Sequence, residues 1–154
     1  MADVEVSTHI AAPAARVWDL IGDPARMGEW SPECTGATWH KSTPAPALGA
    51  KFTGHNRRGW RRWSTTGKVV DFAPGERIAW DVSVMMFPVA RWGYAITPDA
   101  DGTGCTLVET FDDHRDAVAK VLGRPVRGVA DVPTHNRQGM DETLAHIKAA
   151  AEGG

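Results

Sequence analysis

The sequence predicts an α+β fold in which a curved antiparallel sheet of about seven strands wraps around one long C-terminal helix. Residues 31–111 consist of short runs rich in Val, Trp, Thr and Ile that are separated by Gly, Pro and Asp, as in a meander of antiparallel strands. Helical spacing of apolar residues appears in two short segments before this region and in one long segment after it. A chain of 154 residues is long enough to bury a core, so we expect a single domain over residues 1–154.

The N-terminal segment is expected to form one strand and two short helices. Residues 3–10 alternate apolar and polar side chains, which is typical of a strand. Residues 12–21 have a proline, Pro13, near the first helical turn and then place apolar side chains on one helical face, at Val17, Trp18 and Ile21. Asp23 is positioned to cap a second short helix over residues 24–30.

Six further strands are expected between turns of Gly, Pro and Asp. Their ranges are 34–40, 50–56, 60–72, 76–85, 89–97 and 104–112, with breaks that include Arg57–Gly59 and Phe87–Pro88. Alternation gives the last three strands one apolar face each, which carries Ile78, Trp80, Val82 and Val84, then Trp92, Tyr94 and Ile96, then Cys105, Leu107, Glu109 and Phe111. An antiparallel sheet with one apolar face needs a cover on that side.

The C-terminal segment is the predicted cover. Helical spacing over residues 134–152 aligns Met140, Leu144 and Ile147, with Thr143 and Ala151 beside them. Gly153 and Gly154 are a natural stop. Residues 115–132 are expected to form a broken helix, because glycines and prolines interrupt them.

Composition points to a cytoplasmic protein with no bulk affinity for nucleic acid. Lys and Arg number 17 against 19 Asp and Glu, which gives a net charge of −2. The N-terminus lacks the basic and apolar regions of a signal peptide, and no window approaches the ~20 apolar residues of a membrane span. Cys34 and Cys105 match no metal-binding spacing, so two reduced thiols are expected, with one disulfide as the alternative.

Four stretches of the chain carry a resemblance to a known group of proteins. They are APAARVW at 12–18, RMGEWSPE at 26–33, GKVVDFAPGERIAW at 67–80 and DGTGCT at 101–106. With the order of elements, they resemble the START-like (SRPBCC) superfamily of helix-grip proteins, and within it the polyketide cyclase/dehydrase type. The resemblance implies a cavity between the sheet and the C-terminal helix that holds a small hydrophobic ligand. It implies no particular reaction, because this fold serves carriers as well as enzymes.

Glu109 and Tyr94 are the candidate catalytic residues. If the alternation is right, Glu109 points to the apolar side between Leu107 and Phe111, where burial would raise its pKa and suit it to proton transfer. A shift of one residue would instead place it in water, or it could pair with an arginine as a structural ion pair. Tyr94 is the only tyrosine, and its hydroxyl could donate to a ligand carbonyl or serve a structural hydrogen bond.

The predicted ligand-binding residues are mostly aromatic. They are Trp30, Trp39, Trp63, Trp80, Trp92, Tyr94, Ile96, Leu107, Phe111, Met140 and Leu144. Such walls suit a small, mainly apolar molecule, although the same rings could simply fill a closed core.

Residues 55–63, HNRRGWRRW, hold four arginines and two tryptophans. Basic and aromatic side chains together can bind single-stranded nucleic acid or another anionic partner. The simpler interpretation is a hairpin tip with solvated arginines, because the whole chain is slightly acidic.

No cofactor and no metal are expected. The segment 112–116 and the pair His135 and Asn136 offer ligand atoms, but neither has the spacing of a metal motif. His135 and Asn136 could touch the ligand, although solvent exposure is the simpler expectation.

The sequence therefore predicts binding of a small hydrophobic or aromatic metabolite, such as a polyketide or a lipid, with cyclisation or dehydration as its catalytic form. The alternative is a protein- or RNA-interaction module that uses the Arg- and Trp-rich hairpin and catalyses nothing. Either could be a monomer or a homodimer.

Overall fold

The computed structural model describes residues 2–115 and 132–153. The elements in chain order are β1 (Val4–Ile10), α1 (Ala14–Ile21), the 3-10 helix η1 (Pro24–Glu29), β2 (Cys34–Trp39), β3 (Lys51–Arg58), β4 (Arg61–Ala73), β5 (Arg77–Val84), β6 (Phe87–Pro98), β7 (Cys105–Asp113) and α3 (Val132–Gly153). This order confirms the predicted α+β fold, with two short helices after the first strand and a long C-terminal helix. Residues 116–131 of the broken helix expected over residues 115–132 lie outside the described residues.

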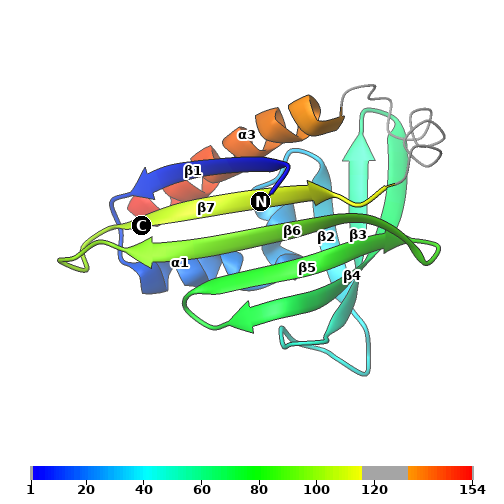
Figure 1. Ribbon diagram of the computed structural model, residues 1–154, viewed down its shortest axis with the longest axis horizontal. Helices are drawn as coiled ribbons and strands as arrows, with labels where there is room; N and C mark the ends of the chain where they lie inside the picture. The colour runs from blue at the N-terminus through cyan, green and yellow to red at the C-terminus, as the bar shows by residue number, and fades with distance from the viewer. Residues whose placement is uncertain (1, 116–131, 154) are drawn as a thin grey trace.

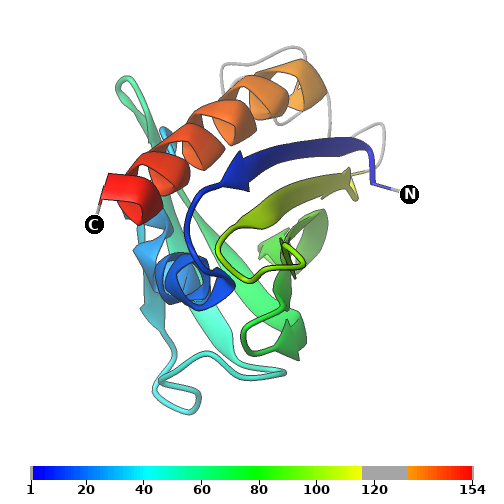
Figure 2. The same cartoon turned by 90° about the vertical axis from the view of Figure 1, so that its left-hand side faces the viewer.

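The seven strands form one antiparallel sheet in the order β1-β7-β6-β5-β4-β3-β2. Successive strands from β2 to β7 are therefore neighbours, and β1 joins the free edge of β7. The register shifts at three places, between Cys34 and Gly36, between Val69 and Asp71, and between Val82 and Ser83. Such bulges increase local twist and bending. Figure 2 shows the result, a sheet that curls into an open arc.

Two turns differ from the sequence-based expectation. The break between β5 and β6 falls at Met85 and Met86, not at Phe87–Pro88, because both methionines adopt positive φ angles, 50° and 72°. Pro88 already lies inside β6, opposite Ser83. Likewise Arg57 and Arg58 belong to β3, and the β3–β4 turn is made by Gly59, with φ 61°, and Trp60.

The concave face of the sheet carries the core. The predicted alternation is confirmed in β7, where Cys105, Leu107, Glu109 and Phe111 are all buried. It holds in β5 and β6 for Ile78, Trp80, Tyr94 and Ile96. It fails at Val84, which is 36% exposed because it is the last residue of β5 and lies at the tip of the β5–β6 hairpin.

Helix α3 spans the opening of the arc and buries Met140, Thr143, Leu144, Ile147 and Ala151. Figures 1 and 2 show it beside β1, with α1 below it. Burying a side chain such as Met140, Leu144 or Ile147 typically contributes about 1.5–3 kcal/mol, so these three residues hold the helix on the sheet.

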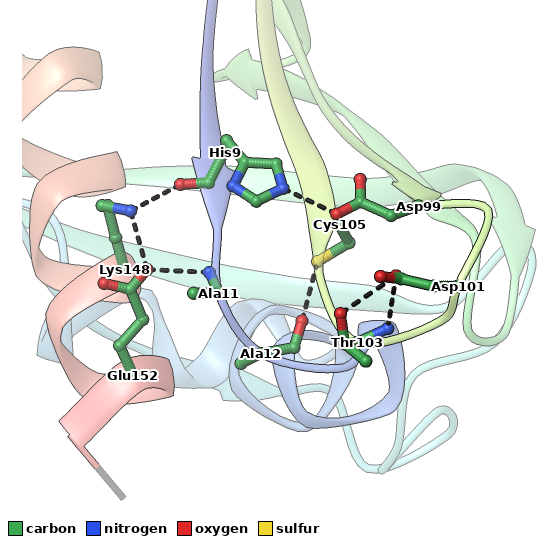
Figure 3. Close-up of polar contacts among 9 residues, drawn as sticks. All are labelled: His9, Ala11, Ala12, Asp99, Asp101, Thr103, Cys105, Lys148 and Glu152. Carbon is green, nitrogen blue, oxygen red and sulfur yellow. Dashed lines mark hydrogen bonds and ion pairs between the residues drawn. The ribbon is translucent and has the colours of Figure 1, made fainter.

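Polar contacts fasten the last turns of α3 to β1 (Figure 3). Lys148 donates to the carbonyl oxygen of His9 at 2.6 Å and to the Glu152 carboxylate at 2.7 Å. The same carboxylate accepts from the backbone N–H of Ala11 at 2.8 Å. The ring of His9 contacts Asp99 at 2.7 Å, which ties β1 to the loop after β6. This end of the helix is therefore fixed by charged groups as well as by packing.

Candidate functional site

Glu109 and Tyr94 form the centre of the candidate site. They face each other across β6 and β7, and Val6 of β1 lies on the other side of Glu109. The Tyr94 hydroxyl donates to Glu109 Oε1 at 2.7 Å. Glu109 is 2% exposed and Tyr94 is 5% exposed, so the pair lies out of contact with bulk water.

Burial keeps this pair neutral over most of the physiological range. It raises the pKa of Glu109 from an ordinary 4.5 to about 8; the hydrogen bond from Tyr94 opposes the rise, and the charge of Asp141 on α3 adds to it. Burial, followed by the charge of Glu109, raises the pKa of Tyr94 well above 10. At neutral pH, Glu109 is therefore mainly a carboxylic acid that can donate a hydrogen bond.

One oxygen of this acid is left open. Glu109 Oε2 is buried and has no hydrogen-bond partner among the described residues. A buried polar atom without a partner costs roughly 1–3 kcal/mol, so its presence needs an explanation. Because Tyr94 donates to Oε1, the proton of the neutral acid is available on Oε2.

Asn136 supplies a second open donor. This α3 residue is 5% exposed, and its Nδ2 has no partner within residues 2–115 and 132–153. It lies four residues before Met140 and thus on the helical face that packs on the sheet. The expectation that Asn136 is solvent exposed is wrong, because a polar residue near a helix start can still face the sheet when the helix is laid across it.

His135 joins α3 to the other end of the sheet. Its Nε2 contacts the Glu33 carboxylate at 2.8 Å, and its ring nitrogens lie 3.3 Å from the Arg58 guanidinium. The residue is half-buried rather than fully exposed. It therefore links the start of α3, next to Asn136, to β3 and to the loop before β2.

Aromatic rings form a continuous row along the sheet from the Tyr94 side. Trp80 stacks on Tyr94 with ring centroids 5.9 Å apart, and Phe52 meets Trp80 edge-on at 6.2 Å. Trp39 continues the row by an edge contact with Phe52 at 5.3 Å. Between β6 and β7, Trp92 contacts Phe111, with ring centroids 4.9 Å apart.

The predicted lining residues divide by exposure. Buried are Trp30, Trp80, Tyr94, Ile96, Leu107, Phe111, Met140 and Leu144, and half-buried are Trp39, Trp63 and Trp92. The indole N–H of Trp30 donates to the Leu20 carbonyl at 3.0 Å, and that of Trp39 to Asp23 at 3.1 Å. These two N–H groups are therefore already used within the fold, unlike Glu109 Oε2 and Asn136 Nδ2.

The two cysteines and the acidic segment 112–116 contribute less to the candidate site than Glu109 and Asn136 do. Cys34 and Cys105 are separate thiols, and burial raises the pKa of each. Asp113 forms an ion pair with Arg115 at 2.8 Å. Within the described part of the chain, no three His, Cys, Asp or Glu residues gather as a metal site would require.

The family model described as polyketide cyclase/dehydrase and lipid transport matches residues 1–152. The chain belongs to this family. A search of curated proteins found no match.

Several solved structures share the fold. The chain is similar to a Polyketide_cyc-like protein of Corynebacterium glutamicum, with 28% identity, a TM-score of 0.65, and coverage of 96% of this chain and 89% of that one. A Thermobifida fusca protein is 24% identical with a TM-score of 0.61, and the alignment covers 99% of this chain and 96% of that one. The di-domain ARO/CYC StfQ of the steffimycin biosynthetic pathway is 12% identical with a TM-score of 0.68, over 97% of this chain and 44% of StfQ.

These findings confirm the predicted helix-grip fold and the polyketide cyclase/dehydrase type. They favour hydrophobic ligand binding as the general role. None of the described helices has the length and apolarity to cross a membrane.

Proposed function

We propose that the protein binds a small, mainly apolar or aromatic metabolite that carries a carbonyl oxygen, between the concave face of the sheet and α3. The observation that carries the proposal is the open Oε2 of Glu109, a buried acid oxygen that finds no partner in residues 2–115 and 132–153. The open Nδ2 of Asn136 on the facing helix supports it. Buried donors are normally satisfied, so a ligand acceptor explains both.

The chemistry of the two donors selects the ligand class. At neutral pH the Glu109 acid and the Asn136 amide both offer hydrogen, and each requires an acceptor such as a ketone or quinone oxygen. The aromatic row at Tyr94, Trp80 and Phe52 favours flat rings over flexible chains. An aromatic ketone, the kind of molecule formed in polyketide chemistry, meets both demands.

Glu109 is also suited to proton transfer on such a ligand. A carboxyl group with a pKa of about 8 can donate a proton to a ligand oxygen, or accept one from an activated carbon, near neutral pH. We therefore assign Glu109 as the acid–base residue of any cyclisation or dehydration that the protein performs, with Tyr94 holding its carboxyl in place. Glu109→Gln would then abolish turnover of an offered polyketide while leaving its binding in place.

Native mass spectrometry of the protein as purified is the first test, followed by denaturation and identification of any released molecule. We expect an aromatic ketone or a related apolar metabolite. An apo mass together with no binding of the probes below would contradict the proposal.

A matched pair of probes tests the role of Glu109 directly. 2-Acetylnaphthalene and 2-ethylnaphthalene have nearly the same shape, but only the first has a carbonyl oxygen. At pH 6 we expect the ketone to bind about tenfold more tightly, the worth of one buried hydrogen bond, as measured by quenching of Trp fluorescence. Glu109→Gln should keep this preference, because the amide still donates, and Glu109→Met should lose it. Equal preference in all three proteins would rule out Glu109 as the donor.

A further inference from the structure

The β5–β6 hairpin ends in an exposed apolar tip. Met85 is 85% exposed, Met86 is 95% exposed and Phe87, the first residue of β6, is 71% exposed. Val84 beside them is 36% exposed. Four successive apolar residues at a hairpin tip are unusual for a surface in contact only with water, and they indicate an apolar partner.

The backbone of this tip is also unfavourable for the residues that form it. Met85 and Met86 have φ angles of 50° and 72°, the left-handed region that two-residue hairpin turns usually fill with Asn and Gly. Met85 and Met86 therefore combine two unfavourable features, a strained backbone and apolar side chains exposed to water. Strain that folding does not require points to a function of the side chains themselves.

The β3–β4 hairpin ends in a tip of a different kind. Trp60 is 81% exposed, and the guanidinium of Arg61 lies 4.5 Å from the centre of its ring. Arg57 and Arg62 on the flanking strands are exposed as well. The surrounding stretch, residues 34–70, holds seven Lys and Arg and no Asp or Glu, although the whole chain has a net charge of −2. The positive charge is thus concentrated on β2–β4.

Both tips lie at the same end of the sheet. The end of β5 pairs with the first half of β4, since Ser83 is opposite Thr66, so the β3–β4 hairpin extends past the β5–β6 turn in the same direction. In Figure 1 the β5–β6 hairpin turns at the right-hand end of the molecule, and the β3–β4 hairpin turns higher up, at the top right, because the sheet curls between them. The two tips therefore belong to the same end of the strands.

We propose that this end of the molecule docks on an anionic lipid bilayer. Met85, Met86 and Phe87 enter the boundary between headgroups and acyl chains, and Trp60 lies at the headgroup level, where tryptophan is enriched. Arg57, Arg61 and Arg62 bind the lipid phosphates. The methionine tip decides between a bilayer and RNA, because RNA offers no apolar layer for exposed methionines, whereas a bilayer accepts both tips. This inference does not depend on the ligand proposed above.

Vesicle co-sedimentation tests the proposal with the full chain. We expect binding to vesicles of equal parts phosphatidylcholine and phosphatidylglycerol, weaker binding to phosphatidylcholine alone, and a fall in binding as salt is raised. The double variant Met85→Asn, Met86→Gly replaces the apolar side chains with residues that suit the turn. It should bind at least about tenfold more weakly while its Tm stays the same or rises. Undiminished binding by a folded variant would overturn the role of this tip.

Two charge variants provide a matched comparison. Arg57→Gln with Arg62→Gln removes two charges at the β3–β4 tip, and we expect about tenfold or greater loss of binding to the anionic vesicles. Lys41→Gln with Lys51→Gln removes two charges around the start of β3, at the end of that strand away from the tip, and should lose much less. Equal losses would mean that overall charge, not the tip, drives binding.

Lipids brominated on their acyl chains report the depth of Trp60. They should quench part of the Trp fluorescence, and Trp60→Ser should remove that part while the other six tryptophans remain. An alternative outcome is binding of polyuridylic acid that depends on Arg57 and Arg62 but not on Met85 and Met86, with no binding to vesicles. That result would overturn the bilayer proposal in favour of RNA.

Discussion

Glu109 combines a buried carboxyl group, one hydrogen bond and one open oxygen. Removing an ionised carboxylate from water is expensive, so burial raises the pKa of Glu109 to about 8. Below that pH the group is mainly a neutral acid. The hydrogen bond from Tyr94 at 2.7 Å fixes the carboxyl without satisfying it fully. A residue used only for stability would be better replaced by an apolar one, which is why we interpret Glu109 as functional.

The stability of the protein should carry the signature of this acid. In the unfolded chain Glu109 releases its proton above about pH 4.5, whereas the folded protein keeps it until about pH 8. The unfolded state therefore binds fewer protons between these values, and the free energy of unfolding falls as pH rises, by up to ~1.4 kcal/mol per pH unit. Glu109→Gln has no proton to release, so its stability relative to wild type should increase from pH 5 to pH 8 and then level off.

Urea unfolding at a series of pH values measures this difference. Glu5→Gln is the matched control, because it makes the same change from acid to amide at a side chain of β1 that is exposed to water. We expect the difference between Glu5→Gln and wild type to be nearly flat over the same range. A flat difference for Glu109→Gln would show that the Glu109 carboxyl titrates near its ordinary pKa in the folded protein.

The sequence could place Glu109 but not its partners. Alternation along β7 predicts that Glu109 shares a face with Leu107 and Phe111, and the structure confirms this burial. The hydrogen bond from Tyr94 depends on the β6–β7 register, which alternation within one strand does not contain. The burial of Asn136 depends on how α3 crosses the sheet, and no local pattern reports that crossing.

At the scale of the elements, β4 shows how the sheet makes room for its aromatic row. Gly67 lies opposite Phe52 of β3, and the Phe52 ring covers the space that a side chain at Gly67 would fill. A Cβ there would lie 2.2 Å from the nearest ring carbon. The glycine thus lets Phe52 lie flat on the strand and reach Trp80 and Trp39.

Gly67→Ala should therefore displace the Phe52 ring and disturb the whole aromatic row. We expect it to destabilise the protein by about 1–3 kcal/mol in urea unfolding, the usual cost of overpacking. Gly54→Ala on β3 is the control. Its Cβ would meet the Thr65 hydroxyl at 2.9 Å, a group that can rotate away, so the cost should be clearly smaller. If both variants lost the same stability, a general cost of alanine in these strands would explain the result.

Elements were predictable from the sequence to within about two residues, while turns were harder. Apolar alternation and Gly or Pro boundaries locate every strand, since both follow directly from strand geometry. The β5–β6 turn was misplaced at Phe87–Pro88 because proline is an ordinary turn signal. The structure turns at Met85 and Met86 instead, and no propensity rule predicts two successive methionines with positive φ angles.

For the whole molecule, α3 is the element that closes the arc of the sheet, and its two ends are held differently. The C-terminal end is fixed by Lys148, Glu152 and Arg16, whose guanidinium donates to the carbonyl oxygens of Ala151 and Ala150, both at 3.0 Å. The N-terminal end is held through His135, with Glu33 and Arg58. Glu33 and Arg58 lie on the β2–β3 side of the sheet, whereas the C-terminal contacts are made to α1 and to the end of β1.

Arg16→Gln tests whether the C-terminal end is the fixed one. The last carbonyls of a helix lack partners within the helix, and a cation there is favourable, so the loss should be about 1 kcal/mol in the free energy of unfolding. Arg137→Gln, an exposed position near the other end of α3, should change stability little. Hydrogen exchange should locate the effect, with faster exchange at residues 147–152 of the Arg16 variant and little change at residues 136–141. Faster exchange along the whole helix would mean that α3 moves as one rigid unit, and ligand entry would then require the entire helix to lift from the sheet.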